Sequence, residues 1–181
     1  MMKTERLVLR QWNGDDLQDF SKMCGDREVM EFFPKLLTQD ESRRMGEKIK
    51  SLIAERGWGL WAVEAPSQRK FMGFVGLNIP TDCMPFSPCV EVGWRLARRY
   101  WGMGYATEAA AESLRYAFNH LGLDEVVSFT TVSNIRSQAV MKKLGMTYAS
   151  NFMHPELDPS NPLCEHVLYK INRSQWENHA L

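Results

Sequence analysis

The stretch Arg99-Tyr100-Trp101-Gly102-Met103-Gly104-Tyr105-Ala106 joins two segments of different periodicity. Residues 90–96 alternate as in a strand, and the alanine-rich residues 106–121 predict a helix. The two glycines let the backbone turn sharply, and the first helical turn directs N–H groups and the positive end of the helix dipole to one point. Arg99 adds a fixed positive charge. The stretch therefore predicts a loop that binds phosphate groups.

The residues around Gly104 separate this loop from two other phosphate-binding loops. A Walker loop needs a lysine directly after its last glycine, but Tyr105 follows Gly104. A dinucleotide-binding loop needs a third glycine at position 107, which is Thr107. A glycine-rich turn that binds no ligand is the alternative interpretation.

Length and charge limit the class of protein. The chain has 181 residues and a formal net charge of zero, so we expect residues 1–181 to form a single domain. Nucleic-acid binding needs a basic field, and a membrane span needs about 20 apolar residues, so we expect neither partner. The four cysteines form no Cys-x-x-Cys pair, and no apolar signal region follows Met1. We therefore expect reduced thiols, no metal site and a cytoplasmic protein.

Local patterns predict the element order β-α-α-β-β-β-α-β-α-β-β. The strands are expected at residues 5–12, 58–64, 71–79, 90–96, 126–132, 146–153 and 166–171, with a polar turn at 65–69. The helices are expected near 17–23, at 38–56, 106–121 and 134–144, and from 174. Thr38 and Glu41 have capping-box spacing, and Gly57 and Gly122 are expected to end their helices. Antiparallel strands followed by βα units predict a mixed sheet with helices on both faces.

A second motif, Asn134-Ile135-Arg136-Ser137, begins the helix that ends in Lys143-Leu144-Gly145-Met146. Together with the loop at 99–106, it resembles the two cofactor motifs of the GNAT N-acetyltransferases. The segments 4–10, 101–109 and 166–169 are similar to the RimJ/RimL-like branch, which contains the ribosomal-protein N-terminal acetyltransferases. The resemblance covers nearly the whole chain.

The resemblance implies an α+β (α/β three-layer) fold. Its GNAT-like mixed, mostly antiparallel, twisted sheet would have six to seven strands and helices on both faces. Strands 90–96 and 126–132 would be parallel neighbours that splay apart and form the cofactor cleft. Because buried unpaired backbone groups are costly, this cleft would bind a ligand with amides, such as pantetheine.

The resemblance also implies which residues bind acetyl-CoA. Backbone groups of Trp94 and Leu96 would pair with pantetheine, and Asn134 would bond to it from the other side. The pyrophosphate would be held by Arg99, Gly102, Met103, Gly104, Tyr105 and Ala106, and the cofactor would run along Ser137, Met141 and Lys143. The alternatives are a plain helix cap for Asn134 and a solvated helix face for Lys143.

The implied reaction is direct attack of a neutral amine on the thioester in a ternary complex, which needs a proton acceptor and a proton donor. Glu91 is the expected base, because its side chain points away from Val90 and Val92 beside the split. An ion pair with an arginine is the alternative. Many family members carry a tyrosine where this chain has Met141. Ser137 is therefore the expected acid, with Tyr148 as a weaker candidate.

Acidic side chains outnumber basic ones between Asn13 and Glu31. In similar enzymes the first two helices line the acceptor cleft, so this segment predicts attraction of a cationic amine. A solvated acidic face is the alternative. We expect the acceptor to be a protein N-terminal α-amine, and the enzyme to be a monomer or homodimer. Other interpretations are an acetyltransferase for small cationic amines, a non-catalytic acyl-CoA-binding sensor and a nucleotide-binding protein.

Overall fold

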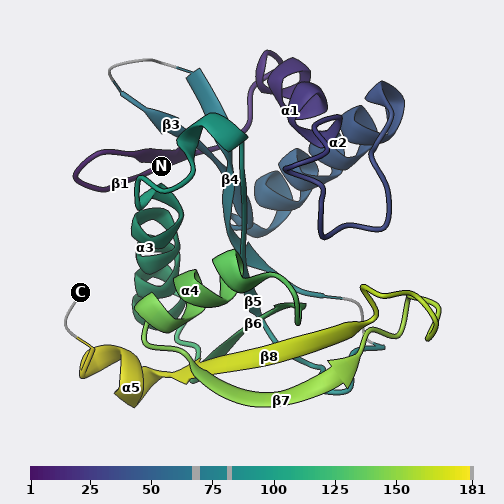
Figure 1. The fold of residues 1–181 in the computed structure, drawn as a ribbon. Coiled ribbons are helices and arrows are strands. Elements are labelled where there is room, and N and C mark those ends of the chain that lie inside the picture. Colours follow the sequence, from purple (N-terminus) through teal and green to yellow (C-terminus); the bar gives the residue numbers. More distant parts are fainter. Residues whose placement is uncertain (67–69, 81–82, 180–181) are drawn as a thin grey trace.

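A computed structural model describes residues 1–66, 70–80 and 83–179 (Figure 1). Its sheet has the strand order β1-β2-β3-β4-β5-β6-β8-β7. The strands are β1 (Met2–Lys3), β2 (Val8–Arg10), β3 (Leu60–Ala65), β4 (Lys70–Asn78), β5 (Glu91–Leu96), β6 (Glu125–Thr131), β7 (Thr147–Met153) and β8 (Glu165–Asn172). The helices are α1 (Asp16–Cys24), α2 (Gln39–Arg56), α3 (Tyr105–Asn119), α4 (Ile135–Lys143) and α5 (Arg173–Glu177), with a 3-10 turn η1 (Arg98–Tyr100).

The predicted mixed, mostly antiparallel sheet is confirmed, but its strand count was wrong. The described residues form eight strands instead of six to seven, because the two-residue β1 pairs with β2. The strand predicted at 5–12 shrinks to Val8–Arg10, since the chain turns where Thr4 N–H donates to the carbonyl of Leu7. Of the predicted turn at 65–69, residues 67–69 lie outside the described residues.

The ends of two helices show where local sequence signals are enough to predict the bounds of a helix and where they are not. At α2, Thr38 and Glu41 form the predicted capping box, and Gly57 ends the helix with a left-handed φ of 80°. At α3, the last helical residue is Asn119 and the C-cap is His120, so the prediction that Gly122 caps this helix was wrong.

Helices cover both faces of the sheet (Figure 1). On one face, Tyr116 of α3 packs against Trp61 of β3 with ring centroids 5.3 Å apart. On the other, Phe20 of α1 packs against Phe74 of β4 at 5.9 Å. Buried aromatic and aliphatic side chains on both faces make one continuous core.

The register of β5 assigns its side chains to these faces. Arg95 pairs with Phe74, so its side chain lies on the face covered by α1. Side chains alternate along a strand, so Glu91 shares this face and Trp94 lies on the face covered by α3 and α4. β5 therefore presents an acidic and a basic side chain toward α1.

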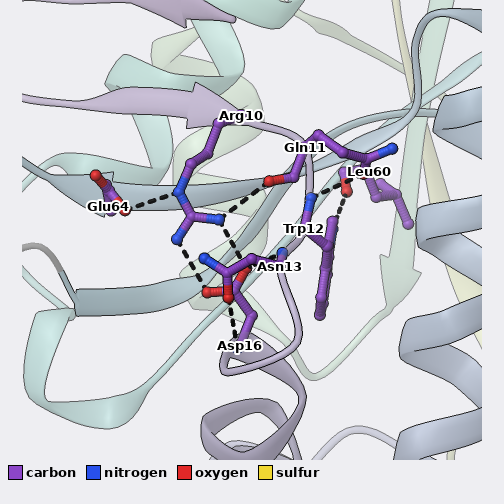
Figure 2. A network of polar contacts seen from close by, with 7 residues as sticks. All are labelled: Arg10, Gln11, Trp12, Asn13, Asp16, Leu60 and Glu64. Atoms are coloured by element: carbon purple, nitrogen blue, oxygen red, sulfur yellow. Dashed lines mark hydrogen bonds and ion pairs between the residues drawn. The ribbon is translucent and has the colours of Figure 1, made fainter.

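A polar network fixes the start of α1 against the sheet (Figure 2). Arg10 donates from Nη1 and Nη2 to the two carboxylate oxygens of Asp16, at 2.7 and 2.9 Å, and from Nε to Glu64 at 2.7 Å. The Asp16 hydrogen bonds hold the pKa of Arg10 above its ordinary value. Trp12 Nε1 donates to the carbonyl of Leu60 at 2.8 Å. Because each buried charge has a partner, the network anchors α1 without a desolvated, unpaired group.

Candidate active site

β5 and β6 are parallel neighbours that pair at a single position. In the described residues, Glu91 and Val127 are the single residue pair between them, and Val127 N–H donates to the carbonyl of Val90 at 2.9 Å. On its other side, β5 pairs with β4 over six residues. The two strands diverge after their one pair, which confirms the predicted splay.

The backbone groups of Trp94 and Leu96 face this split. The carbonyl of Val90 points to β6, whereas Ala97 N–H donates away from it to Met72. Backbone groups alternate along a strand, so even-numbered residues of β5 point to β6. Trp101 Nε1 already donates to the carbonyl of Leu96 at 2.8 Å. The groups that face the split include both backbone groups of Trp94 and the N–H of Leu96, an arrangement that suits a ligand with amides.

The loop before α3 has the geometry of an anion site. Gly102 and Gly104 have φ values of 75° and 81°, a left-handed conformation that a side chain would strain. Within the described part of the chain, the N–H groups of residues 102–107 have no acceptor. Arg99 is exposed beside them, with its guanidinium 4.8 Å from the ring of Tyr100. Six such amides and one cation thus lie in a single loop, a combination that suits an anion.

A clamp from the N-terminal segment holds this loop in place. Arg6 donates from Nη1 to the carbonyl of Met103 at 3.0 Å and from Nε to Glu108 at 2.6 Å. Its guanidinium also lies 4.7 Å from the ring centroid of Tyr105. This role of Arg6 was not predicted, since its partner Glu108 is 102 residues away in the chain. Its place in the family-like opening segment was the signal that could have found it.

Glu91 lies where the two strands part. It is half-buried, forms no ion pair with any described residue, and accepts one hydrogen bond, from Asn78 Nδ2 at 3.4 Å. Burial raises the pKa of Glu91 to about 7, because desolvation disfavours the carboxylate more than Asn78 stabilises it. A Cβ atom on Gly93 would meet only Glu91, 3.7 Å from Oε1. Bare backbone therefore lies beside a carboxyl group suited to accept a proton near neutral pH.

Ser137 connects the two arms of the split. Its Oγ accepts hydrogen bonds from Trp94 Nε1 at 3.3 Å and from Asn134 Nδ2 at 3.1 Å. The Ser137 hydroxyl proton has no acceptor among the residues that the structure describes, so it is available for donation. Asn134 Nδ2 also donates to Thr130 Oγ1, and Asn134 Oδ1 caps α4 by accepting from Ser137 N–H. Asn134 is thus a helix cap, and its Oδ1 keeps one lone pair for a ligand.

Three other predicted residues have contrasting environments. Met141 is buried in the core and offers no polar atom. Lys143 is exposed at the end of α4. Tyr148 lies 57% exposed on β7, which β6 and β8 separate from β5. This position removes Tyr148 as a candidate acid at the split.

Most acidic side chains of the segment 15–31 already have basic partners. The pairs are Asp16–Arg10, Asp19–Lys22, Glu28–Arg98 and Glu31–Arg136. Arg136 also lies 4.6 Å from the ring of Trp101, so α4 contacts the segment that follows β5. The pairing neutralises much of the acidic surface that the sequence predicted for a cationic acceptor.

An aromatic wall, which sequence reasoning missed, lies on the Glu91 face of the neighbouring strands. Phe129 is two residues beyond Val127, the partner of Glu91, and therefore shares its face. The wall consists of Phe86, Phe129, Phe152, His154 and His166, whose adjacent ring centroids are 4.9 to 6.5 Å apart.

A metal site and a membrane-spanning helix are two further features that residues 1–66, 70–80 and 83–179 could contain. No three His, Cys, Asp or Glu side chains gather there in a way that could hold a metal ion. None of the helices in these ranges has the length and apolar character to cross a membrane.

Comparison with known proteins places this geometry in a family. Residues 6–147 match the family model described as "Acetyltransferase (GNAT) domain". The FsC-acetyl coenzyme A-N(2)-transacetylase of Aspergillus fumigatus is 33% identical over 97% of this chain and 77% of its own. A ribosomal-protein-S5-alanine acetyltransferase from Vibrio fischeri has a similar fold, with a TM-score of 0.75 at 19% identity over 97% of each chain. So does a spermidine N-acetyltransferase from Vibrio cholerae in complex with CoA and spermine, with a TM-score of 0.74 at 20% identity over 97% of this chain and 100% of that one. With its split sheet and amide-rich loop, this chain belongs to the GNAT acetyltransferase family, as an acetyl-CoA-dependent N-acetyltransferase.

Proposed function

We propose that the protein transfers the acetyl group of acetyl-CoA to an α-amine, foremost that of a protein N-terminus, by direct attack in a ternary complex. The environment of Glu91 is the observation on which the proposal depends. Glu91 combines a pKa of about 7 with the absence of an ionic partner in the described residues, and it stands beside the split that fits pantetheine. The resemblance to the RimJ/RimL-like branch supports the same acceptor.

The pKa of Glu91 favours an α-amine over a polyamine or a lysine side chain. A peptide α-ammonium has a pKa of about 7.7–8.0, whereas a lysine ammonium has one of about 10.4. Proton transfer to a carboxylate of pKa about 7 is therefore uphill by about one unit for the α-amine and by more than three for the alkyl amine. Each unit corresponds to about 1.4 kcal/mol, so the α-amine is the easier nucleophile to prepare.

The other steps follow from the neighbouring groups. The amine nitrogen attacks the thioester carbon, and the oxyanion accepts a hydrogen bond from a backbone N–H of residues 92–94. When the C–S bond breaks, the Ser137 hydroxyl donates its proton to the departing thiolate and regains one from water. The backbone of Trp94 and Leu96 and Asn134 Oδ1 would hold pantetheine, and the amides of residues 102–107 with Arg99 would hold the pyrophosphate.

A small α-amine acceptor is the second candidate function. The relative from Aspergillus fumigatus is 33% identical over nearly the whole chain, and its name specifies transfer from acetyl coenzyme A to an N(2) position. An acceptor of this kind requires the same Glu91 chemistry. It differs from a protein N-terminus in size and in the groups around the amine.

Release of free CoA, measured with a thiol reagent, tests the proposal. The acceptors are a peptide with a free α-amine, the same peptide with its α-amine blocked, a blocked peptide that contains lysine, and spermidine. We expect turnover with the first peptide only. Turnover with spermidine or lysine alone would contradict the α-amine assignment. Binding of acetyl-CoA without release by any amine would favour a non-catalytic sensor.

A further inference from the structure

Within the described part of the chain, Arg95 is buried without a counterion. Its residue surface is 8% exposed, and no carboxylate lies within ion-pair distance of its guanidinium. Nη1 donates to the Sγ atom of Cys24 at 3.4 Å, which is a weak acceptor. Nε is fully buried with no partner, and Nη2 has no acceptor among the described residues.

This state is costly for a guanidinium. A buried charge normally has a hydrogen-bonded counterion, as Arg10 has in Asp16 (Figure 2). The rings of Phe33 and Phe74, with centroids 4.0 and 5.4 Å from Cζ of Arg95, give cation–π stabilisation but no acceptor. Desolvation lowers the pKa of Arg95. An anion from outside the chain that bonded to Arg95 would therefore offset the cost of burying this charge.

The two unsatisfied atoms lie on one edge of the guanidinium. The Nε and Nη2 edge of an arginine binds a carboxylate through two parallel hydrogen bonds. In Arg95, Cys24 takes the opposite edge, and the rings of Phe33 and Phe74 flank the group. Nε is fully buried, so contact through it requires a neighbouring side chain to move, and Phe33, 37% exposed with its ring 4.0 Å from Cζ, is one that lies against the guanidinium.

Arg95 and Glu91 face the same side of β5 with Gly93 between them. Four residues at about 3.4 Å each place their Cα atoms roughly 13–14 Å apart. Gly93 has no side chain to obstruct the path between them. A molecule lying over Gly93 would meet the carboxyl group at one end and the guanidinium at the other.

We propose that Arg95 binds an anionic group of the acceptor, so that the substrate carries a carboxylate several bonds from its reactive amine. The inference rests on the proposed function, which places that amine at Glu91. It specifies the acceptor further, as an α-amine compound or peptide N-terminus with an acidic group nearby. Glu28 and Glu31 are already paired with Arg98 and Arg136. Their neutralised carboxylates would repel an anionic acceptor less than free ones.

Matched acceptor peptides test the inference by kinetics. Each pair has glutamate or glutamine at the second, third or fourth position, so only the charge differs. For at least one position we expect wild type to show a kcat/KM at least ~10-fold higher with glutamate, a ratio that corresponds to one bidentate charge-assisted contact. In Arg95→Met this ratio should fall to about one, while kcat/KM for the glutamine peptide stays within about threefold. Arg95→Lys should keep part of the preference, and the matched control Arg98→Met, an exposed arginine nearby, should keep all of it.

A second measurement does not depend on turnover. Glutarate should raise the melting temperature of the CoA-loaded wild type, its neutral diamide should not, and Arg95→Met should lose the effect. CoA alone should stabilise wild type and Arg95→Met equally, which excludes the cofactor as the anion at Arg95.

The outcomes separate the two proposals. If glutarate stabilises only proteins with Arg95 and no amine is acetylated, the proposed function fails and the anion site stands. If peptides are acetylated with the same glutamate-to-glutamine ratio in wild type and Arg95→Met, the anion site is refuted and the function stands. Preference of wild type for spermidine over every acidic acceptor also overturns the inference.

Discussion

A carboxyl group that titrates near pH 7 should make the reaction pH dependent. Only the ionised form of Glu91 accepts a proton, so kcat/KM should rise with pH through about 7. In Glu91→Gln the rate should fall by roughly 10²–10⁴-fold and this limb should disappear. Titration of the acceptor amine affects both proteins equally, so the difference between their pH–rate profiles reports on Glu91. A Gln variant that retained the limb would exclude Glu91 as the base.

The same carboxyl group should lower the stability of the folded protein at high pH. The folded pKa of about 7 exceeds the unfolded value of about 4.3, so the folded state binds more protons between these pH values. The free energy of unfolding should therefore fall as pH rises from about 4.5 to 7 and then level off. Glu91→Gln should gain stability relative to wild type at pH 8 and not at pH 4, measured by denaturant unfolding.

Ser137 offers a second test at the scale of single atoms. Ser137→Ala removes the proton that we assign to the departing thiolate, and kcat should fall by at least ~10-fold. The control Thr130→Val removes another acceptor of Asn134 and leaves the Ser137 hydroxyl in place. Both variants should lose about 1 kcal/mol of stability, but only Ser137→Ala should lose rate. Equal rates in the two variants would show that water, and not Ser137, protonates the departing thiolate.

Among elements, the loop before α3 depends on two backbone conformations. Gly102 has a left-handed φ of 75° with open space around it, so Gly102→Ala tests the backbone alone. We expect a stability loss of about 1–2 kcal/mol and at least ~10-fold weaker acetyl-CoA binding, measured by calorimetry. Gly122→Ala is the matched control, with a φ of 69° and equally open space, and should lose stability without losing affinity. Equal affinity in both variants would argue that the loop amides do not bind the cofactor.

Elements were predictable where their signals are local. Thr38, Glu41 and Gly57 lie at the ends of α2 and fix its bounds within the segment itself. The end of α3 depends instead on Arg173, which donates to the carbonyls of Phe118 and Leu123 from about 50 residues further along. The strand β1 likewise exists only through its pairing with β2.

In the candidate site, too, the features with local sequence signals were predictable and those that depend on distant contacts were not. Alternation along 90–96 predicted which way Glu91 points, and the family resemblance predicted the split beside it. The glycine spacing predicted an amide-rich loop. Periodicity assigns a side chain to a face of the sheet but not its partners, so it could not show that Arg95 is buried without a carboxylate. The role of Arg6 was hidden for the same reason, since its partner Glu108 is distant in the chain.

For the molecule as a whole, acetyl-CoA should act as the missing connection between two parts of the sheet. A ligand at 100 times its dissociation constant adds about 2.7 kcal/mol, which for a chain of this size raises the melting temperature by roughly 5–10 °C. We expect this rise with acetyl-CoA and CoA, not with ATP or NADH, and a smaller one in Arg99→Ala. An equal rise with NADH would refute the cofactor assignment of the loop.

The opening between β5 and β6 is a window that connects the two faces of the sheet, which elsewhere separates them. Trp94 and Ser137 lie on the side of α4, and Glu91 and Arg95 lie on the side of α1. On the proposed assignment, the donor approaches from one side and the acceptor from the other, and they meet only at the opening. Neither substrate then obstructs the other, so both should enter and leave in either order. A large folded protein could therefore present its chain end to the window without displacing the donor.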